Sequence, residues 1–289
     1  MAQAKQRMSL SYLHAVFRHR SKRAIREGIV KGVLVGATPE QVVHCRGPMC
    51  SACAKCKATR HSFARANSAN GTTAVPSMAC PIIPLDPYNE EVVTDVKGSI
   101  GVDGPNGERW FQLFTQKRTR WRDPKLFALR SKASDAVKEY FAIDCAREGM
   151  KIVRYHADGA PELISSEIVQ FLAERGCRVT FSSPYTPEQN GLAEISNRVI
   201  WEPAITMLMA CLLPMMFWTY AVMYSAAIAN CFPTWTCKGL MSPLQCKYGI
   251  IPDVTLFRIF GCLCYVHIPE QLRTGLAEKA YKGWFVGLQ

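Results

Sequence analysis

Residues 151–194 read KIVRYHADGAPELISSEIVQFLAERGCRVTFSSPYTPEQNGLAE, and this stretch decides the fold class. The apolar run over 151–155 predicts a strand, and the apolar spacing over 166–175 predicts a helix. A second strand is predicted over 177–181, followed by a Pro-rich loop and a helix that starts near Gly191. Strands and helices therefore alternate, which is typical of an α/β domain.

The flanking sequence extends this pattern in both directions. Upstream, strands are predicted over 91–96, 109–115 and 125–129, and a helix over 134–148. Strands that come first in a group and then alternate with helices favour a mixed sheet flanked by helices. The last segment, 256–289, returns to short strand-like runs, and we expect a small β-rich region that the end of the chain truncates.

One stretch raises the question of a membrane segment. Residues 204–237 contain no charged side chain and are long enough to span a bilayer. However, Pro214 interrupts the stretch, and several polar residues dilute it. We therefore predict two buried helices joined near Leu213-Pro214 in preference to a transmembrane span.

The charge of the chain is concentrated at its N-terminus. The 289 residues carry a net charge of +12, and residues 1–65 hold 13 of the 35 Lys and Arg but only two of the 23 Asp and Glu. At 48% hydrophobic residues the chain is neither disordered nor collagen-like. A basic block of this kind predicts a polyanion partner, most simply nucleic acid, with a solvated basic tail as the alternative.

The cysteines indicate a reducing compartment. There are 13 of them, an odd number, and the first ten residues contain no apolar leader segment. We therefore expect reduced thiols in an intracellular protein, and not the disulfide framework of a secreted one.

Three carboxylates lie at predicted strand ends or a predicted helix start, where side chains are held rigidly enough to form a catalytic site. Asp95 and Asp158 each end a predicted strand, and Glu194 lies in the first turn of a predicted helix, so their side chains can converge above one edge of the sheet. Converging carboxylates repel one another unless a divalent cation shares them, and oxygen ligation suits Mg²⁺ or Mn²⁺. Spacing alone is weak evidence, since each acid could be a surface carboxylate, and Glu194 could simply complement a helix N-terminus.

The context of these acids resembles a known family. Residues 184–194, PYTPEQNGLAE, followed by Asn197 and Arg198, are similar to the signature of retroviral-type integrases, in particular those encoded by copia-type LTR retrotransposons. Asp158 and Glu194 have 35 residues between them, as in the Asp-x35-Glu half of that family's triad. The acidic motifs Thr94-Asp95-Val96-x-Gly98 and 156–163 also match, and further matches follow downstream at Leu213-Pro214, Phe217-Trp218, Ser242-Pro243, Phe260-Gly261-Cys262 and 279–287.

The resemblance implies a domain plan and an activity. It implies a zinc-binding module over 1–65, a linker over 66–90, a ribonuclease H-like integrase core over 91–250, and the start of a small SH3-like β-barrel region over 251–289. Asp95, Asp158 and Glu194 would hold two Mg²⁺ (or Mn²⁺) ions for trimming the element's DNA ends and transferring them into target DNA. The implied partners are retrotransposon cDNA ends and target chromosomal DNA, with a homo-oligomer, no membrane, and a location in the nucleus or a virus-like particle.

The N-terminal histidines and cysteines predict a second metal site. His14-x4-His19 and Cys50-x2-Cys53 supply two imidazoles and two thiolates, the donor set of a closed, structural Zn²⁺ site. The resembling family has the same order of ligands, with Gly where Cys56 stands. The open alternative is a local site made of Cys50, Cys53, Cys56 and His61, and His44 and Cys45 also lie close enough in sequence to bind.

Nucleic-acid contacts are expected from the basic N-terminal block and from polar residues around the catalytic helix. These residues are Arg18, Arg20, Lys22, Arg23, Lys57, Arg60, Gln189, Asn190, Asn197 and Arg198.

The sequence departs from the family at several positions. Arg18 stands where the family usually has Gly before the second histidine, and Ile195 replaces a usually basic residue after Glu194. Gly98-Ser99 replaces Gly-Pro, and Pro203 falls inside the predicted catalytic helix, where it should kink the helix or remove a hydrogen bond. These departures indicate drift in an old element copy. The alternative function is therefore a catalytically degenerate remnant that only binds nucleic acid through its zinc module.

Overall fold

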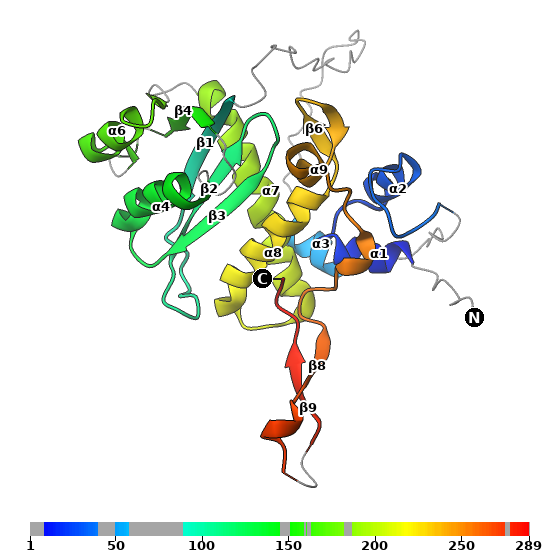
Figure 1. Ribbon diagram of the computed structural model, residues 1–289. Helices are drawn as coiled ribbons and strands as arrows, with labels where there is room; N and C mark the ends of the chain where they lie inside the picture. The colour runs from blue at the N-terminus through cyan, green and yellow to red at the C-terminus, as the bar shows by residue number, and fades with distance from the viewer. Residues whose placement is uncertain are drawn as a thin grey trace, which may run out of the picture.

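Five strands form one mixed sheet, shown in Figure 1 in the computed structural model. The structure describes residues 9–39, 50–57, 89–144, 151–158, 160, 163–181, 187–274 and 278–288. The strand order is β3-β2-β1-β4-β5, with β1, β2 and β3 antiparallel and with β4 parallel to both β1 and β5. The strands are β1 (Asn89–Lys97), β2 (Trp110–Gln116), β3 (Arg122–Phe127), β4 (Lys151–Ala157) and β5 (Arg178–Phe181).

Helices cover both faces of this sheet (Figure 1). Side chains of β2 alternate between two cores because successive strand residues point to opposite faces. Phe111 and Leu113 join one core with α7 (Pro187–Cys211) and α8 (Trp218–Cys231), whereas Phe114 joins the other with α4 and α6. The elements on that second face are α4 (Ala133–Glu139), the π-turn Tyr140–Asp144 and α6 (Ser166–Ala173). The predicted mixed sheet flanked by helices is confirmed.

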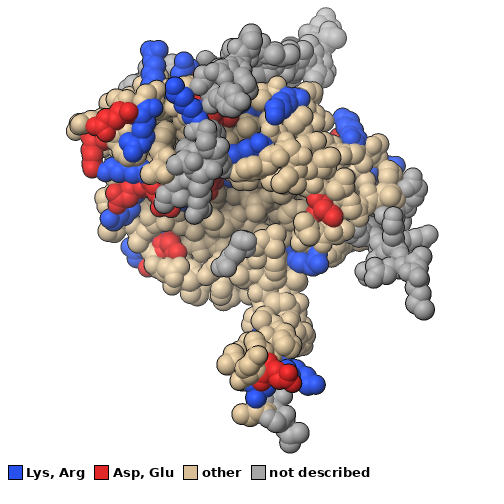
Figure 2. Space-filling view, viewed as in Figure 1, with Lys and Arg blue, Asp and Glu red and all other residues tan. Residues whose placement is uncertain are grey.

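The charge-free stretch forms two helices, as predicted. It contains the last third of α7, a short 3-10 turn over Met215–Phe217, and α8, with Leu213 and Pro214 between the helices. Among the described residues, no helix has both the length and the apolar composition needed to cross a membrane. In Figure 2 the surface around α8 carries few charged side chains, whereas Lys and Arg gather over the sheet half of the same face.

Asn230 joins α8 to the edge strand β3. Its Oδ1 accepts from the backbone N–H of Arg122 at 2.9 Å, and its Nδ2 donates to the carbonyl of the same residue at 2.8 Å. Asn230 is buried, so water cannot replace either bond.

We expect Asn230→Ala to destabilise the protein by about 3 kcal/mol, because two buried backbone groups of β3 lose their partner together. Chemical denaturation followed by circular dichroism measures this loss. Asn106→Ala is the matched control, since Asn106 is exposed and bonds only the neighbouring Glu108 in the described structure. Equal stability losses in the two variants would contradict the prediction.

The N-terminal segment forms three short helices that pack beside α7 and α8 (Figure 1). They are α1 (Leu10–Val16), α2 (Lys22–Val30) and α3 (Ser51–Cys56), and Ser9 and Ser21 cap the first two. Residues 10–35 do not form one continuous helix, because Arg18 and His19 adopt left-handed φ angles of 46° and 58° between α1 and α2. Apolar side chains of α1 and α2 belong to the same core as α7 and α8. The module and the sheet domain therefore share one hydrophobic interior.

The C-terminal part of the chain contains small β-elements. A hairpin of β6 (Thr234–Thr236) and β7 (Gly239–Met241) precedes α9 (Pro243–Tyr248). A second hairpin of β8 (Leu263–His267) and β9 (Ala280–Trp284) projects away from the rest of the molecule (Figure 1). The predicted strand-like runs are present, and over 251–274 and 278–288 they form a two-stranded hairpin, not a closed barrel.

Candidate active site and metal centre

Two of the predicted carboxylates lie on neighbouring strands of the sheet, Asp95 near the end of β1 and Asp158 directly after β4. Thr94 of β1 pairs with Ala157 of β4 in the parallel register, so Asp95 and Asp158 come one residue later on adjacent strands. Parallel strands end at the same edge of a sheet. The backbones of these two residues therefore lie side by side at one edge of the sheet.

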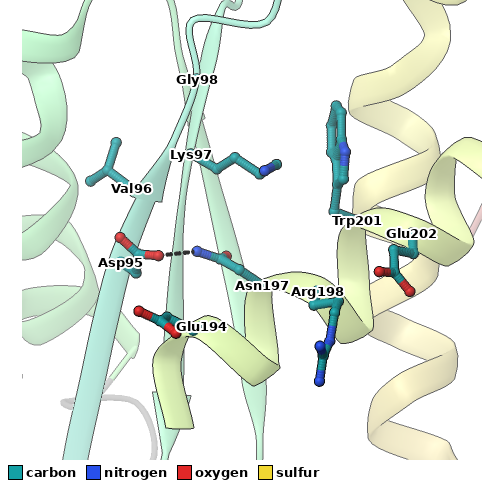
Figure 3. A pocket seen from close by; sticks show the side chains of 9 residues that line it. All are labelled: Asp95, Val96, Lys97, Gly98, Glu194, Asn197, Arg198, Trp201 and Glu202. Carbon is teal, nitrogen blue, oxygen red and sulfur yellow. Dashed lines mark hydrogen bonds between the residues drawn. The ribbon is translucent and has the colours of Figure 1, made fainter. Parts of the chain in front are cut away.

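The third carboxylate approaches from α7. A cavity of about 440 Å³ lies between β1 and α7, and Figure 3 shows Asp95 and Glu194 on its opposite walls. Residues three, four and seven positions after Glu194 fall on the same face of a helix, so α7 lines the cavity with a single stripe. The lining residues are Asp95, Val96, Lys97, Gly98, Glu194, Asn197, Arg198, Trp201 and Glu202.

Asn197 holds the Asp95 carboxylate. Its Nδ2 donates to Asp95 Oδ2 at 2.6 Å (Figure 3), and Asn197 is itself buried. Burial raises the pKa of Asp95 above its usual value, the Asn197 hydrogen bond opposes this, and the charges of Asp158 and Glu194 raise the pKa further. The effect of those two charges indicates that the three acids share one electrostatic environment. Asn197, predicted as a nucleic-acid contact, instead uses its amide on Asp95.

The three carboxylates do not form a closed ligand cluster in this structure. Within the described residues, only one group of His, Cys, Asp or Glu side chains has all its ligand atoms within 4.8 Å, and it is the N-terminal group. Asp158 is exposed and is not among the residues that line the cavity. The fold thus brings the acids to one edge without closing them around a common point.

Lys97 and Trp201 are site residues that the sequence analysis missed. Lys97 Nζ lies 5.4 Å from the centroid of the Trp201 ring, and that ring stacks on Phe111 at 5.9 Å. Trp201 follows Glu194 by seven residues, so helical spacing could have placed it on the active-site face. No sequence signal pairs it with Lys97, because that contact depends on how α7 crosses β1.

The predicted histidines and cysteines of the N-terminal module meet in space. His14 Nε2 lies 3.3 Å from both His19 Nδ1 and Cys53 Sγ, and His19 Nδ1 lies 3.3 Å from Cys50 Sγ. Bonds of about 2.0–2.3 Å to a tetrahedral ion separate neighbouring ligand atoms by about 3.3–3.8 Å. The four side chains therefore fit around one metal ion. His44, Cys45 and His61 lie outside the described residues, and Cys56 is not part of the group.

The surroundings of this group prepare the histidines for metal binding. His14 Nδ1 lies 2.6 Å from the carbonyl of Arg20, which holds the proton on Nδ1 and leaves Nε2 free to ligate. Burial lowers the pKa of His14, and burial with the neighbouring His14 lowers the pKa of His19 to about 4, so both imidazoles are neutral at pH 7. Burial raises the pKa of the Cys53 thiol to about 11, an effect that a bound cation would oppose.

Not all predicted nucleic-acid contacts reach the surface. Arg18 is only 2% exposed, which corrects its prediction, because a buried guanidinium cannot meet a phosphate. Arg20 is half-buried over the Phe232 ring at 4.6 Å, and half-buried Lys57 donates to the carbonyl of His19 at 2.7 Å. Arg23 and Arg198 are exposed, and Lys22 is partly exposed. Arg60 and the side chains of Gln189 and Asn190 lie outside the described residues.

Comparison with known proteins gives relatives of one kind. No family model matches the chain. The "Retrovirus-related Pol polyprotein from transposon TNT 1-94" of Nicotiana tabacum is 29% identical over 202 residues, which is 68% of this chain and 15% of that protein. The corresponding polyprotein from transposon RE2 of Arabidopsis thaliana is 30% identical over 183 residues, 62% of this chain and 12% of that protein. The homologues of the chain are copia-type Pol polyproteins of plant transposons.

The chain spans only 12% to 15% of the length of these relatives. Solved structures similar to this chain include the HTLV-2 integrase catalytic core domain in complex with magnesium. It is 14% identical with a TM-score of 0.42, over 57% of this chain and 99% of that one. Another is the simian T-cell lymphotropic virus intasome in complex with PP2A regulatory subunit B56 gamma, 16% identical with a TM-score of 0.44, over 69% and 68% of the two chains.

Proposed function

We propose that the chain is the integrase segment of a copia-type retrotransposon Pol polyprotein. Its reactions would be metal-dependent trimming of the element's DNA ends and their transfer into target DNA by transesterification. The observation that supports the proposal is that Asp95 near the end of β1 and Asp158 just after β4 lie on adjacent parallel strands, with Glu194 facing Asp95 from α7. The homology to Pol polyproteins supports the same role.

Asp95, Asp158 and Glu194 are the residues that would hold Mg²⁺ or Mn²⁺. Their donor set fits, since carboxylate oxygens are the ligands these ions prefer. Burial and, to a smaller extent, the charges of Asp158 and Glu194 raise the pKa of Asp95, and a bound cation would oppose both effects. Two bound ions would supply activation of the attacking oxygen and stabilisation of the leaving oxygen. The chain itself contributes orientation, because Asn197 fixes the Asp95 carboxylate, and Arg198 at the cavity offers a cation to a DNA phosphate.

The N-terminal group would hold one structural Zn²⁺ ion through His14, His19, Cys50 and Cys53. Two nitrogen and two sulfur ligands without an open position are typical of structural zinc and not of catalytic zinc. We infer that Lys22, Arg23 and Arg198 contact DNA phosphates in a largely sequence-independent way, and that Arg20 and Lys57 contribute at the edge of the module.

The proposed partners follow from the proposed reaction. They are retrotransposon cDNA ends and target chromosomal DNA, which a homo-oligomer of the chain would hold together. The proposed site of action is the nucleus or a virus-like particle.

A strand-transfer assay tests the proposal. Purified zinc-loaded protein is incubated with Mn²⁺, a labelled duplex that models an element end, and a plasmid target. We expect labelled DNA to become joined to the plasmid, and Asp158→Asn to remove this product. If the protein forms no product and Asp158→Asn changes nothing, the enzymatic proposal fails.

Asn197 offers a milder test of the same site. We expect Asn197→Ala to weaken Mn²⁺ binding by about 10- to 100-fold, because a hydrogen bond that orients a metal-ligating carboxylate has an effect of this size. Isothermal titration calorimetry on zinc-loaded protein measures the affinity. Thr119→Ala is the control, since its hydroxyl bonds Gln116 away from the cavity, and unchanged affinity in Asn197→Ala would contradict the assigned role.

A second candidate function is nucleic-acid binding without catalysis. The separation of Asp158 from the cavity favours it, as does Ile195 in place of a basic residue. It predicts DNA binding with a steep salt dependence that substitution of Asp95, Asp158 or Glu194 leaves unchanged. Calorimetry discriminates the two functions, because an intact catalytic site should bind Mg²⁺ and lose it in Asp95→Asn.

A further inference from the structure

Pro203 leaves a gap in the hydrogen bonding of α7. In an α-helix the carbonyl of Val199 accepts from the N–H of residue 203, but proline has no N–H to donate. The proline ring also crowds the carbonyl of the preceding turn. Val199 lies five residues after Glu194 and one after Arg198, within the helix that carries the proposed site.

Arg18 fills this gap from the N-terminal module. Its Nη1 donates to the carbonyl of Val199 and, at 3.1 Å, to Ser225 Oγ of α8. Ser225 in turn donates to the carbonyl of Ile200 at 2.8 Å. Arg18 is 2% exposed and Ser225 is fully buried, so the bonds form in the interior that the module shares with α7 and α8.

The backbone at Arg18 shows that the side chain is needed there. Its φ of 46° is left-handed, a conformation that glycine adopts without strain and that a residue with a Cβ adopts at a cost. An arginine at this position therefore has two costs, which are the left-handed backbone conformation and the removal of its charge from water. The two donated hydrogen bonds act against both costs, because charged donors to buried acceptors make the stronger hydrogen bonds.

We propose that Arg18 and Pro203 are a matched pair, in which Arg18 acts as a positioning residue for the catalytic helix. Resting on the proposed function, this gives the metal module a role in the active site. His19 is the next residue after Arg18, so the metal group anchors the backbone from which the guanidinium reaches α7. Arg18 and Pro203, which separately look like drift, then compensate each other.

A double-mutant cycle on the zinc-loaded full chain tests the pairing. Pro203→Ala restores an N–H that can donate to Val199, so it removes the need for Arg18. We expect Arg18→Met to lower the folded-to-unfolded ratio about tenfold to hundredfold in the natural background. In the Pro203→Ala background we expect it to lower the ratio by about threefold or less. If the double variant's folded-to-unfolded ratio lies within about twofold of the value expected from multiplying the two single effects, the residues are not coupled and the proposal is overturned.

Two further variants keep the result interpretable. Arg20→Met removes a guanidinium that stacks on Phe232, and its effect should combine independently with Pro203→Ala. Arg18→Gly relieves the left-handed backbone while removing the donor, and it should still destabilise the protein. If Arg18→Gly is as stable as the natural chain, the guanidinium is not needed and the proposal fails. If Arg18→Met does not fold, the double variant should fold again, and its failure to do so would also overturn the pairing.

Hydrogen exchange and turnover separate positioning from general stability. In folded Arg18→Met, amides of 199–207 should exchange faster than those of β1 and β2, and the Pro203→Ala background should restore their protection. Turnover at saturating DNA should fall with little change in KM and recover in the double variant. Uniform exchange across the chain would overturn the positioning role. If the natural protein is inactive but the double-mutant cycle still shows that Arg18 and Pro203 are coupled in stability, only the proposed function fails and the pairing stands.

Discussion

Asp95→Asn should reduce strand transfer by at least about a thousandfold, which corresponds to about 4 kcal/mol of transition-state stabilisation. The substitution keeps the shape of the side chain and removes the negative charge. Asp95 is the one of the three acids that Asn197 holds by a hydrogen bond, and the charges of Asp158 and Glu194 both act on it. A neutral amide at this position would bind a divalent cation poorly, so the reaction would lose the ion that the other two acids cannot hold alone.

The same variant should not lose stability, and this separates chemistry from folding. Burial, with Asp158 and Glu194, raises the pKa of Asp95 in the folded state. The ionised carboxylate therefore disfavours folding, an effect that is absent below the unfolded pKa, grows between the two pKa values and is complete above the folded one. At pH 7 without divalent metal, Asp95→Asn should melt at or above the temperature of the natural chain. Lower melting in the variant would contradict this account.

Asp103→Asn is the matched control for activity. Asp103 is exposed, pairs with Arg109 at 2.7 Å, and lies outside the cavity. It should transfer strands at the natural rate. Equal losses in Asp95→Asn and Asp103→Asn would remove Asp95 from the catalytic machinery.

Cys53→Ser should release one Zn²⁺ ion per chain and lower the melting temperature by at least about 10 °C. A structural zinc site stabilises its fold by several kcal/mol or more, and each kcal/mol shifts the melting temperature by a few degrees in a chain of this size. The loss should extend beyond the module, because α1 and α2 share a core with α7 and α8. Metal analysis by mass spectrometry and thermal unfolding measure the two effects.

Cys56→Ser is the control for zinc, and it decides between the two candidate ligand sets. Cys56 lies three residues after Cys53 but outside the group whose ligand atoms lie within 4.8 Å of one another. We expect it to retain zinc and to melt close to the natural chain. Zinc loss in Cys56→Ser together with zinc retention in His14→Ala would instead favour a local site around the cysteines.

Most of the fold was predictable because its signals are local. The strand-forming aromatic and apolar residues over 109–115 and the helical spacing over 166–175 are signals carried by neighbours within a few residues, and the strand and the helix form there, with ends that differ by a few residues. The break of the 10–35 segment was not predicted, because nothing in its apolar spacing marks the left-handed turn at Arg18 and His19.

The candidate site was predictable only in part, for a related reason. Motif spacing and the resemblance to a known family together indicated the four candidate metal ligands of the N-terminal module and the three candidate carboxylates, since the family has these residues in the same order. The partners of these residues did not follow from spacing. Asn197 and Asp95 are separated by 102 positions, and Arg18 and Ser225 by 207.

By itself, the sequence determined the residue types and the periodic patterns: an α/β core, acids at two strand ends and one helix start, and a His-His-Cys-Cys set. The tertiary structure alone decided which polar groups are buried and what they meet. It turned Arg18 from an expected DNA contact into an internal donor, and it set Asn197 on Asp95. The physical reason is that burial depends on what packs over a residue, and a buried donor must find its acceptor wherever the packed chain provides one.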